Sequence, residues 1–339
     1  MKHTHYWKIG LGILGFMGLL LALTVVTWAA EGEDLDPPHL VSLDFAPKTV
    51  DTSDADQVIT FTARITDDLS GVDYVYMHFH SPSEKQYHYL WPNLRSGDAL
   101  DGMYTDSIVL PRYSETGVWT VSSVALKDRV TNGRWLDETD LITMSFPTQF
   151  TVTGTISDVT PPQLVSFDFA PKIVDTSGTA LLPRTLTFTA HVTDDLSGVG
   201  DVGIRLISPS GEQTHYESLD LETGNALDGI YRNGFTFPPY SETGVWKVDQ
   251  VSLHDEVTNS RYAYEAELSV LGFPAQFTVT APISDTEPPH LATFDFEPKV
   301  VDTARTSETI TFTARITDDL AGVDYWYFRY YSPSGQYMP

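Results

Sequence analysis

One stretch of this chain occurs three times, and its repetition constrains the fold more than any other feature. It reads ITFTARITDDLSGVDY at residues 59–74, LTFTAHVTDDLSGV at 186–199 and ITFTARITDDLAGVDY at 310–325. Apolar and polar residues alternate in its first half, which is typical of a strand with one buried face. Two carboxylates, a small residue and a glycine follow, and these residues favour a tight turn. Each copy therefore predicts a strand, an acidic turn and a second strand.

The three copies belong to longer repeats, because many other residues recur at constant spacing. Tyr113, Trp119 and Phe150 reappear 127 residues later as Tyr240, Trp246 and Phe277. The third copy matches the first at an offset of 251, from Pro37 and Pro288 to Ser81 and Ser332. We therefore expect three homologous repeats, at residues 36–153, 158–280 and 285–339.

The strand pattern within a repeat predicts its architecture. About seven short strands per repeat, with no helical periodicity, indicate an all-β chain with one β-sandwich in each repeat. In strand A, Val41, Leu43 and Phe45 are expected to face the core, and Trp119 and Trp246 are predicted to be core tryptophans. Pro-Pro pairs open the repeats and are expected to stiffen the linkers between them.

The N-terminus has the pattern of an export signal. Lys2 and Lys8 precede an uncharged apolar run at residues 9–26, and the small side chains of Thr27 and Ala29 fit cleavage after Ala29. An uncleaved anchor is the alternative, because an apolar run of this length can span a bilayer. Residues 1–30 thus predict an apolar export helix, cleaved or retained, with the rest of the chain extracellular or at the cell surface.

The charge balance limits the partners of this chain. It contains 46 acidic and 20 basic residues, for a formal net charge of -26. Such a charge excludes nucleic acid as a partner and disfavours anionic membranes, so contact with a membrane is expected only through the N-terminal segment. It is compatible with divalent cations. The absence of cysteine excludes disulfides and a lipid-modified N-terminal cysteine.

Several short motifs resemble a known family. Pro-Pro-x-Leu, Asp-Asp-Leu-Ser-Gly-Val, Ser-Pro-Ser-Gly, Gly-Val-Trp and Asp-x-Val-Thr-Asn are similar to segments of the bacterial immunoglobulin-like (Big-type) tandem repeats of secreted and cell-surface proteins. The resemblance covers nearly everything after residue 35. It implies tandem immunoglobulin-like β-sandwiches that act as spacers or adhesive modules, some with calcium at their joints. It does not identify a function, since such repeats occur in adhesins, stalks and secreted enzymes alike.

The acidic turns are candidate calcium ligands. Calcium takes several oxygen ligands from loops that converge, and in an immunoglobulin-like sandwich the B–C and F–G loops share one end. Linker acids could add ligands across each joint. The alternative is that one Asp only closes an Asx-type turn on nearby backbone N–H groups. The candidate ligands are Asp67, Asp68, Asp128, Asn132, Asp158, Asp194, Asp195, Asp255, Asn259, Asp285, Asp318 and Asp319.

A second candidate site is the outward face of strand C. Tyr74 and Tyr76 in repeat one, and Tyr325 and Tyr327 in repeat three, are aromatic residues that could stack on sugars or contact a protein. Ordinary cross-strand pairing is the alternative. Three histidines of repeat one, at positions 78, 80 and 88, are a further possible zinc set.

The sequence contains no enzyme signature. No His-Glu-x-x-His, phosphate loop, Gly-x-Ser-x-Gly or dinucleotide fingerprint is present. The paired carboxylates are duplicated in every repeat, whereas an acid–base pair needs two different environments. We therefore expect a non-enzymatic spacer or adhesive stalk, with no cofactor other than calcium.

Two alternatives to the spacer hypothesis remain. One is a module that binds a surface polysaccharide or a protein through the Tyr-rich face. The other is the accessory region of a secreted enzyme whose catalytic domain lies beyond Pro339. Because residues 285–339 contain only strands A to C, we also expect repeat three to be truncated or completed by another chain, with Ile310, Phe312, Ile316, Trp326 and Phe328 exposed.

Overall fold

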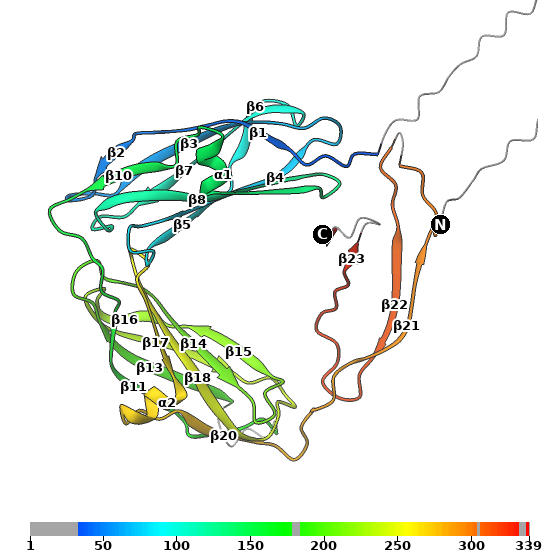
Figure 1. Cartoon of the computed structure of the whole chain (residues 1–339). Coiled ribbons are helices and arrows are strands. Elements are labelled where there is room, and N and C mark those ends of the chain that lie inside the picture. Colours follow the sequence, from blue (N-terminus) through cyan, green and yellow to red (C-terminus); the bar gives the residue numbers. More distant parts are fainter. Residues whose placement is uncertain (1–32, 178–183, 304–305, 332–336, 339) are drawn as a thin grey trace, which may run out of the picture. The chain divides into compact units, whose positions relative to one another are not determined.

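The computed structural model describes residues 33–177, 184–303, 306–331 and 337–338. Within these residues the chain is all-β apart from two short helices, and each repeat has its own sheets (Figure 1). The predicted export segment, residues 1–30, lies outside the described residues. Among the residues that are described, no helix is long and apolar enough to cross a membrane.

Repeat one is a sandwich of two sheets. A four-stranded sheet has the order β1-β3-β7-β6, and a six-stranded sheet has the order β2-β10-β8-β4-β5 with β9 also paired to β8. The elements are β1 (His39–Ala46), β2 (Thr49–Asp51), β3 (Gln57–Thr66), β4 (Val72–His80), β5 (Tyr87–Leu90), β6 (Asn93–Gly97), β7 (Asp101–Leu110), β8 (Gly117–Asp128), β9 (Gly133–Asp137), α1 (Glu138–Thr143) and β10 (Gln149–Thr153).

Repeat two has the same topology. Its sheets have the orders β11-β13-β17-β16 and β12-β20-β18-β14-β15, with β19 also paired to β18. The elements are β11 (Gln163–Ala170), β12 (Ile173–Asp175), β13 (Thr185–Thr193), β14 (Val199–Ile207), β15 (Thr214–Ser218), β16 (Asp220–Asn225), β17 (Asp228–Thr236), β18 (Gly244–Asp255), β19 (Ser260–Tyr264), α2 (Glu265–Val270) and β20 (Gln276–Thr280).

The core of each sandwich lies between its two sheets, as the alternation of the strands predicts. Ile59, Phe61 and Ile65 of β3 are fully buried, and the Phe61 ring lies 4.4 Å from that of Phe79 on β4. The two predicted core tryptophans are completely buried, and Trp119 Nε1 donates to Glu115 O at 2.8 Å. Each such side chain contributes roughly 1.5–3 kcal/mol through burial, so the opposed aromatic faces hold the sheets together.

The observed secondary structure differs from the predicted one at two points. Val41 is exposed, because a β-bulge after Leu40 shifts the register of β1 and turns Leu40 inward instead. The short helices α1 and α2 were not expected, since six residues are too few to show helical periodicity. Asp137 and Asp140 form a capping box at the start of α1, which is the local signal for this helix.

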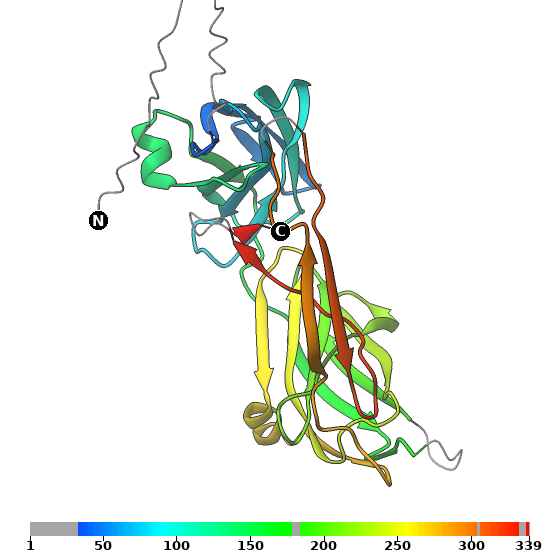
Figure 2. The ribbon, with the colours of Figure 1, turned by 90° about the vertical axis from the view of Figure 1, so that its right-hand side faces the viewer.

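Repeat three is less complete than the other two. Its strands β21 (His290–Glu297) and β22 (Thr311–Thr317) pair in the register of β1 and β3 (Figure 2), and β23 (Tyr330–Tyr331) pairs with β24 (Tyr337–Met338). Of the residues predicted as strand C, 325–329 form no strand, whereas Tyr330 and Tyr331 belong to β23. In repeat one the equivalent strand β4 is held between β5 and β8, and residues 285–339 contain no counterpart of β8.

The apolar face of repeat three is only partly covered. As expected, Ile310 and Trp326 are exposed, whereas their counterparts in repeat one are buried. Phe312, Ile316 and Phe328 are half-buried instead of exposed, because a cluster of aromatic rings packs on β22. This cluster replaces only part of the burial that a second sheet provides in repeats one and two.

Repeat three should therefore be the first part of this chain to unfold. We expect limited proteolysis to cleave the chain between Thr280 and Pro289 or within repeat three, while repeats one and two persist, because few of its apolar side chains are fully buried. Mass spectrometry of the fragments shows which repeat is cleaved first. A protease-resistant, monomeric repeat three would contradict the expectation.

Candidate functional site

The acidic turn of repeat one follows β3 and is closed by the first of its two aspartates. Asp67 Oδ1 accepts from Gly71 N at 2.6 Å and from Leu69 N at 3.2 Å. Gly71 has φ of 90°, and a Cβ there would lie 2.8 Å from the Cβ of Ala99, so this position requires glycine. One carboxylate oxygen of Asp67 thus makes the Asx-type turn.

The same turn is formed in the other two repeats. Asp194 Oδ2 accepts from Leu196 N at 3.0 Å and Gly198 N at 2.8 Å. Asp318 Oδ1 accepts from Leu320 N at 3.1 Å and Gly322 N at 2.6 Å. The loop geometry is therefore a property of the repeated motif.

The second oxygen of the turn aspartate has no hydrogen-bond donor. Asp67 Oδ2 is buried without a partner, on a residue that is only 8% exposed, and Asp194 Oδ1 is in the same situation. A buried carboxylate oxygen without a donor is costly unless a ligand neutralises it. In repeats one and two the turn therefore explains one oxygen of the aspartate and leaves the other available to a cation.

Three carboxylates converge at the start of every repeat. In each group the ligand oxygens lie within 4.8 Å of one another. The groups are Asp34, Asp67 and Asp128 (cluster one), Asp158, Asp194 and Asp195 (cluster two), and Asp285, Asp318 and Asp319 (cluster three). In each cluster an acidic residue from the preceding linker meets the acidic turn of the repeat.

The linker aspartate makes the same contact in all three clusters. Its Oδ2 accepts from the backbone N–H two residues after the second turn aspartate, at 2.8 Å in Asp34, 2.7 Å in Asp158 and 2.7 Å in Asp285. Asp34 was not among the ligands predicted from the sequence. The signal was present, because Asp34 and Asp285 have the offset of 251 that relates repeats one and three.

The remaining predicted ligands include one member of a cluster and several residues outside the clusters. Asp128 belongs to cluster one, whereas Asp68 lies outside that group and Asp255 lies outside cluster two. Asn132 Nδ2 donates to Asp128 Oδ2 at 2.6 Å and to Asp34 O at 3.1 Å. The corresponding Asn259 Nδ2 donates to Asp255 Oδ2 at 2.6 Å and to Asp158 O at 3.3 Å. Both asparagines thus connect a buried aspartate to the linker.

Burial shifts the acids around these clusters toward their protonated forms. Desolvation raises the pKa of Asp128, although hydrogen bonds from Asn132 oppose the shift. Desolvation raises the pKa of Asp194, with further repulsion from Asp158 and Asp195. The pKa of Asp255 rises to about 7, mainly through burial. At clusters one and two, burial therefore favours a proton or a bound cation over bare carboxylates at these aspartates.

The composition of the clusters suits a hard divalent cation. All ligand atoms are carboxylate oxygens, whereas zinc sites are built mostly from histidine and cysteine. Calcium takes six to eight oxygen ligands in flexible geometry, so three carboxylates with backbone carbonyls and water would complete its shell. The residues present therefore fit calcium.

The tyrosine face of repeat one is larger than the sequence indicated. The Tyr74 and Tyr76 rings of β4 stack at 6.3 Å, and Tyr76 also contacts Tyr89, Trp91 and Trp135. These last three residues were missed. The alternation of Tyr87, Tyr89 and Trp91 in β5 and the residue after it could have indicated two of them. In repeat three Tyr325 and Tyr327 stack at 6.4 Å and are both exposed.

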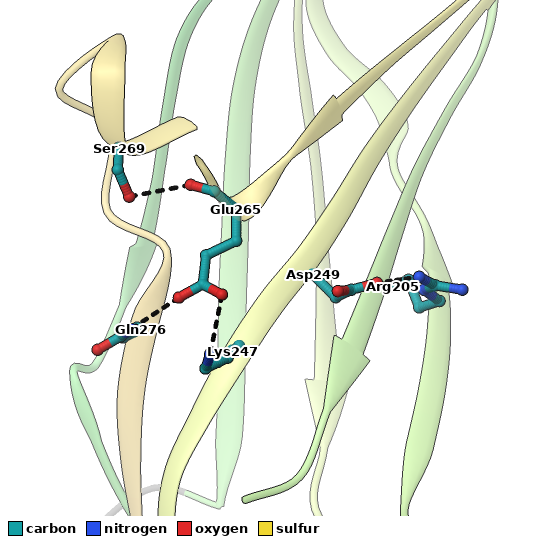
Figure 3. Close-up of polar contacts among 6 residues, drawn as sticks. All are labelled: Arg205, Lys247, Asp249, Glu265, Ser269 and Gln276. Carbon is teal, nitrogen blue, oxygen red and sulfur yellow. Dashed lines mark hydrogen bonds and ion pairs between the residues drawn. The ribbon is translucent and has the colours of Figure 1, made fainter. Parts of the chain in front are cut away.

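Repeat two has fewer aromatic rings at the corresponding place, where only Tyr216 and Tyr262 remain, at the positions of Tyr89 and Trp135. Gly203 stands where repeat one has Tyr76, and Ser218 stands where it has Trp91. Arg205 pairs with Asp249 on this face (Figure 3). Elsewhere in repeat two, Lys247 Nζ lies 2.9 Å from Glu265 Oε2, and Gln276 Nε2 donates to Glu265 Oε1 at 2.7 Å. The aromatic face is therefore not required by the fold.

The histidines of repeat one do not converge as a zinc set. His88 pairs with Phe79 and packs against Trp119 in the core, whereas His78 pairs with Tyr89 on the outward face. Successive residues of a strand point to opposite sides, and this alternation separates the two imidazoles. Burial lowers the pKa of His88 to about 4, so it is a neutral core residue.

Comparisons with known proteins give a partial match. A family model described as a domain of unknown function (DUF7743) matches residues 156–276, which is nearly all of repeat two. No curated protein matches the chain.

Several solved structures are similar at low identity. One is a tetra-tandem repeat in the extending region of a large adhesion protein, at 15% identity over 80% of this chain and 56% of that one, with TM-score 0.24. Another is a leucine-rich repeat protein from Bacteroides thetaiotaomicron, at 10% identity over 64% and 24%, with TM-score 0.17. A marsupial T cell receptor matches at 13% over 65% and 98%, with TM-score 0.25. This chain spans less than two thirds of the length of the first two of these proteins.

The raised pKa of Asp255 predicts a pH dependence in the absence of calcium. The unfolded state releases this proton near pH 3.8, whereas the folded state keeps it until about pH 7, so the stability of repeat two should fall as pH rises from 4 to 7. The expected loss from this residue is on the order of 3 kcal/mol. Denaturant unfolding in chelator, compared between the unchanged chain and Asp255→Asn, measures it. A stability difference that stays constant with pH would contradict the prediction.

Proposed function

We propose that this chain is an exported, non-enzymatic protein of tandem immunoglobulin-like repeats that acts as an extracellular spacer or adhesive stalk stiffened by calcium. The observation that carries the proposal is a three-carboxylate cluster at the start of each repeat, in which the linker aspartate meets the first turn aspartate. The third carboxylate is Asp128 in repeat one and the second turn aspartate in repeats two and three. An acid–base site would not be duplicated in this way, because its two carboxylates must differ in environment. A stiff joint between repeats, in contrast, is required once for each repeat.

The clusters are placed where they would stiffen a joint. Asp158 belongs to the linker between repeats one and two, and Asp194 and Asp195 belong to the body of repeat two. A cation shared by these residues restricts the linker, which already contains the Pro161-Pro162 pair. The same arrangement recurs with Asp285 before repeat three.

Export is consistent with this function. The basic N-terminal head and apolar run are typical of an export signal or an uncleaved anchor. Extracellular calcium-binding modules can work with dissociation constants near 10⁻⁴–10⁻³ M, which suits sites of few protein ligands.

The aromatic face of repeat one supports a second candidate function, binding of a neutral surface polysaccharide. Trp91 and Trp135 are 51% and 62% exposed. Repeat two lacks most of these aromatic rings, although it has the same sandwich fold. A net charge of -26 disfavours an anionic ligand, and aromatic rings with Tyr hydroxyls and Trp N–H groups suit sugars. A protein partner on this face is the other outcome that a binding test can return.

Calcium should raise the melting temperature of repeats one and two. A ligand that binds only the folded state stabilises it by about 1.4 kcal/mol at ten times its Kd, which millimolar calcium reaches for a Kd near 10⁻⁴ M. Changing Asp67 and Asp68 together to Asn should remove the effect from repeat one, as measured by calorimetry in calcium and in chelator.

The control for that experiment is Asp68→Asn alone. It removes a charge from the same turn, but Asp68 lies outside cluster one, so the calcium response should persist. Identical melting in chelator and in millimolar calcium would show that the acidic loops are only turns.

Removing the exposed tryptophans should abolish binding to a polysaccharide. Trp91→Ala with Trp135→Ala should weaken binding at least tenfold, about the loss typical of aromatic anchors. The fold should be preserved because both rings are exposed. The matched control is Tyr216→Ala with Tyr262→Ala, which removes exposed rings from repeat two. If no neutral polysaccharide from a glycan array binds, or if both variants bind equally, this second function is wrong.

A further inference from the structure

The main chain of the linker aspartate Asp158 is held by repeat one. Asp158 N donates to Tyr113 O at 2.8 Å, and Asp158 O accepts from Gln86 Nε2 at 2.6 Å. Asp158 is only 2% exposed. Its carboxylate, in contrast, faces repeat two, where Oδ2 accepts from Ser197 N. One residue therefore connects the end of one repeat to the cluster of the next.

Gln86 is fixed in the orientation that this contact needs. It is fully buried, and its Oε1 accepts from Glu115 N at 2.8 Å, so the amide nitrogen must point toward Asp158. Its backbone is held by Ser81, whose N–H donates to Gln86 O at 2.9 Å and whose Oγ accepts from Gln86 N at 3.3 Å. A buried amide satisfied at both ends is a rigid anchor.

The same anchor occurs at the next joint. Gln213 Nε2 donates to Asp285 O at 3.1 Å, and Gln213 Oε1 accepts from Glu242 N at 3.1 Å. Asp285 N donates to Tyr240 O at 2.8 Å. Two joints thus use the same pair of contacts on the linker aspartate.

Cluster one provides an internal comparison. The carbonyl of its linker aspartate, Asp34, accepts from Asn132 Nδ2, which belongs to the same repeat as the cluster. Within residues 33–177, no glutamine amide is bonded to Asp34. Cluster one is therefore assembled without a contact from a preceding repeat, whereas clusters two and three include one.

We propose that Gln86 and Gln213 are positioning residues for calcium, so that the affinity of clusters two and three depends on the repeat before each of them. The inference rests on the proposed function. Each glutamine holds the linker main chain in place, and the aspartate carboxylate is presented to the acidic turn before the ion arrives. Calcium then has fewer groups to order when it binds, so the calcium affinity of the cluster is higher. Residues that orient metal ligands in this way typically change affinity by about 10–100-fold when replaced.

The experiment follows hydrogen–deuterium exchange of the full chain during a calcium titration. The reporters are the peptides that contain Ser70, Ser197 and Ala321, whose backbone N–H groups bond the three linker carboxylates. The calcium concentration at half-protection measures the affinity of each cluster separately. Gln86→Met keeps the length of the side chain and removes its amide.

We expect Gln86→Met to raise the half-protection concentration of the Ser197 peptide about tenfold. The Ser70 and Ala321 peptides should not change. Gln213→Met is the matched control, and it should shift only the Ala321 peptide. Gln86→Glu keeps an acceptor for Glu115 N but cannot donate to Asp158 O, so it tests the contact if the methionine variant is poorly folded.

Each other outcome overturns the inference. An unchanged Ser197 midpoint in a chain that still binds calcium would show that Gln86 does not position the ligand, and the proposed function would stand. Equal shifts at all three reporters would indicate general destabilisation instead of positioning. If calcium protects none of the reporters in the unchanged chain, the proposed function fails and the positioning role fails with it.

Discussion

The repulsion among three carboxylates whose oxygens lie within 4.8 Å is the constraint on which the rest of this structure depends. Backbone N–H groups and buried amides hold these acids in place, so they cannot move apart when they ionise. Burial adds to the cost, since water cannot solvate the charges fully. A proton or a bound cation at a cluster would relieve this cost. This cost connects the local turn to the behaviour of the joint between repeats.

A single aspartate can serve both the turn and the cluster because a carboxylate has two oxygens. One oxygen of Asp67 accepts the N–H groups that close the loop, which is a purely structural role. The other oxygen is buried and has no donor. The structural and ion-binding interpretations of the acidic turn are thus compatible. This explains why one short motif can be repeated as a unit, since turn and ligand are copied together.

Repeats one and two share the contacts at the joint but differ on the exposed face of the sheet. Both hold the linker with a glutamine amide and a tyrosine carbonyl, and both place a tryptophan in the core. On the outward face, repeat one has stacked rings, whereas repeat two has fewer rings and an ion pair of Arg205 with Asp249. Core and joint residues are constrained by many contacts at once. An exposed face is constrained by few, so it is free to acquire a separate binding role.

Strand alternation and turn residues are local signals, so the repeats, the all-β class, the inward face of β3 and the core tryptophans could be predicted from the residues alone. The turn aspartates and the linker acids Asp158 and Asp285 were predicted in the same way. The fold was needed to show that Asp34 completes cluster one, that Asp68 and Asp255 lie outside the clusters, and that His88 faces the core. It alone revealed the contact of Gln86 with Asp158. These outcomes depend on which loops and strands meet in the folded sandwich, which the pattern of a single strand does not encode.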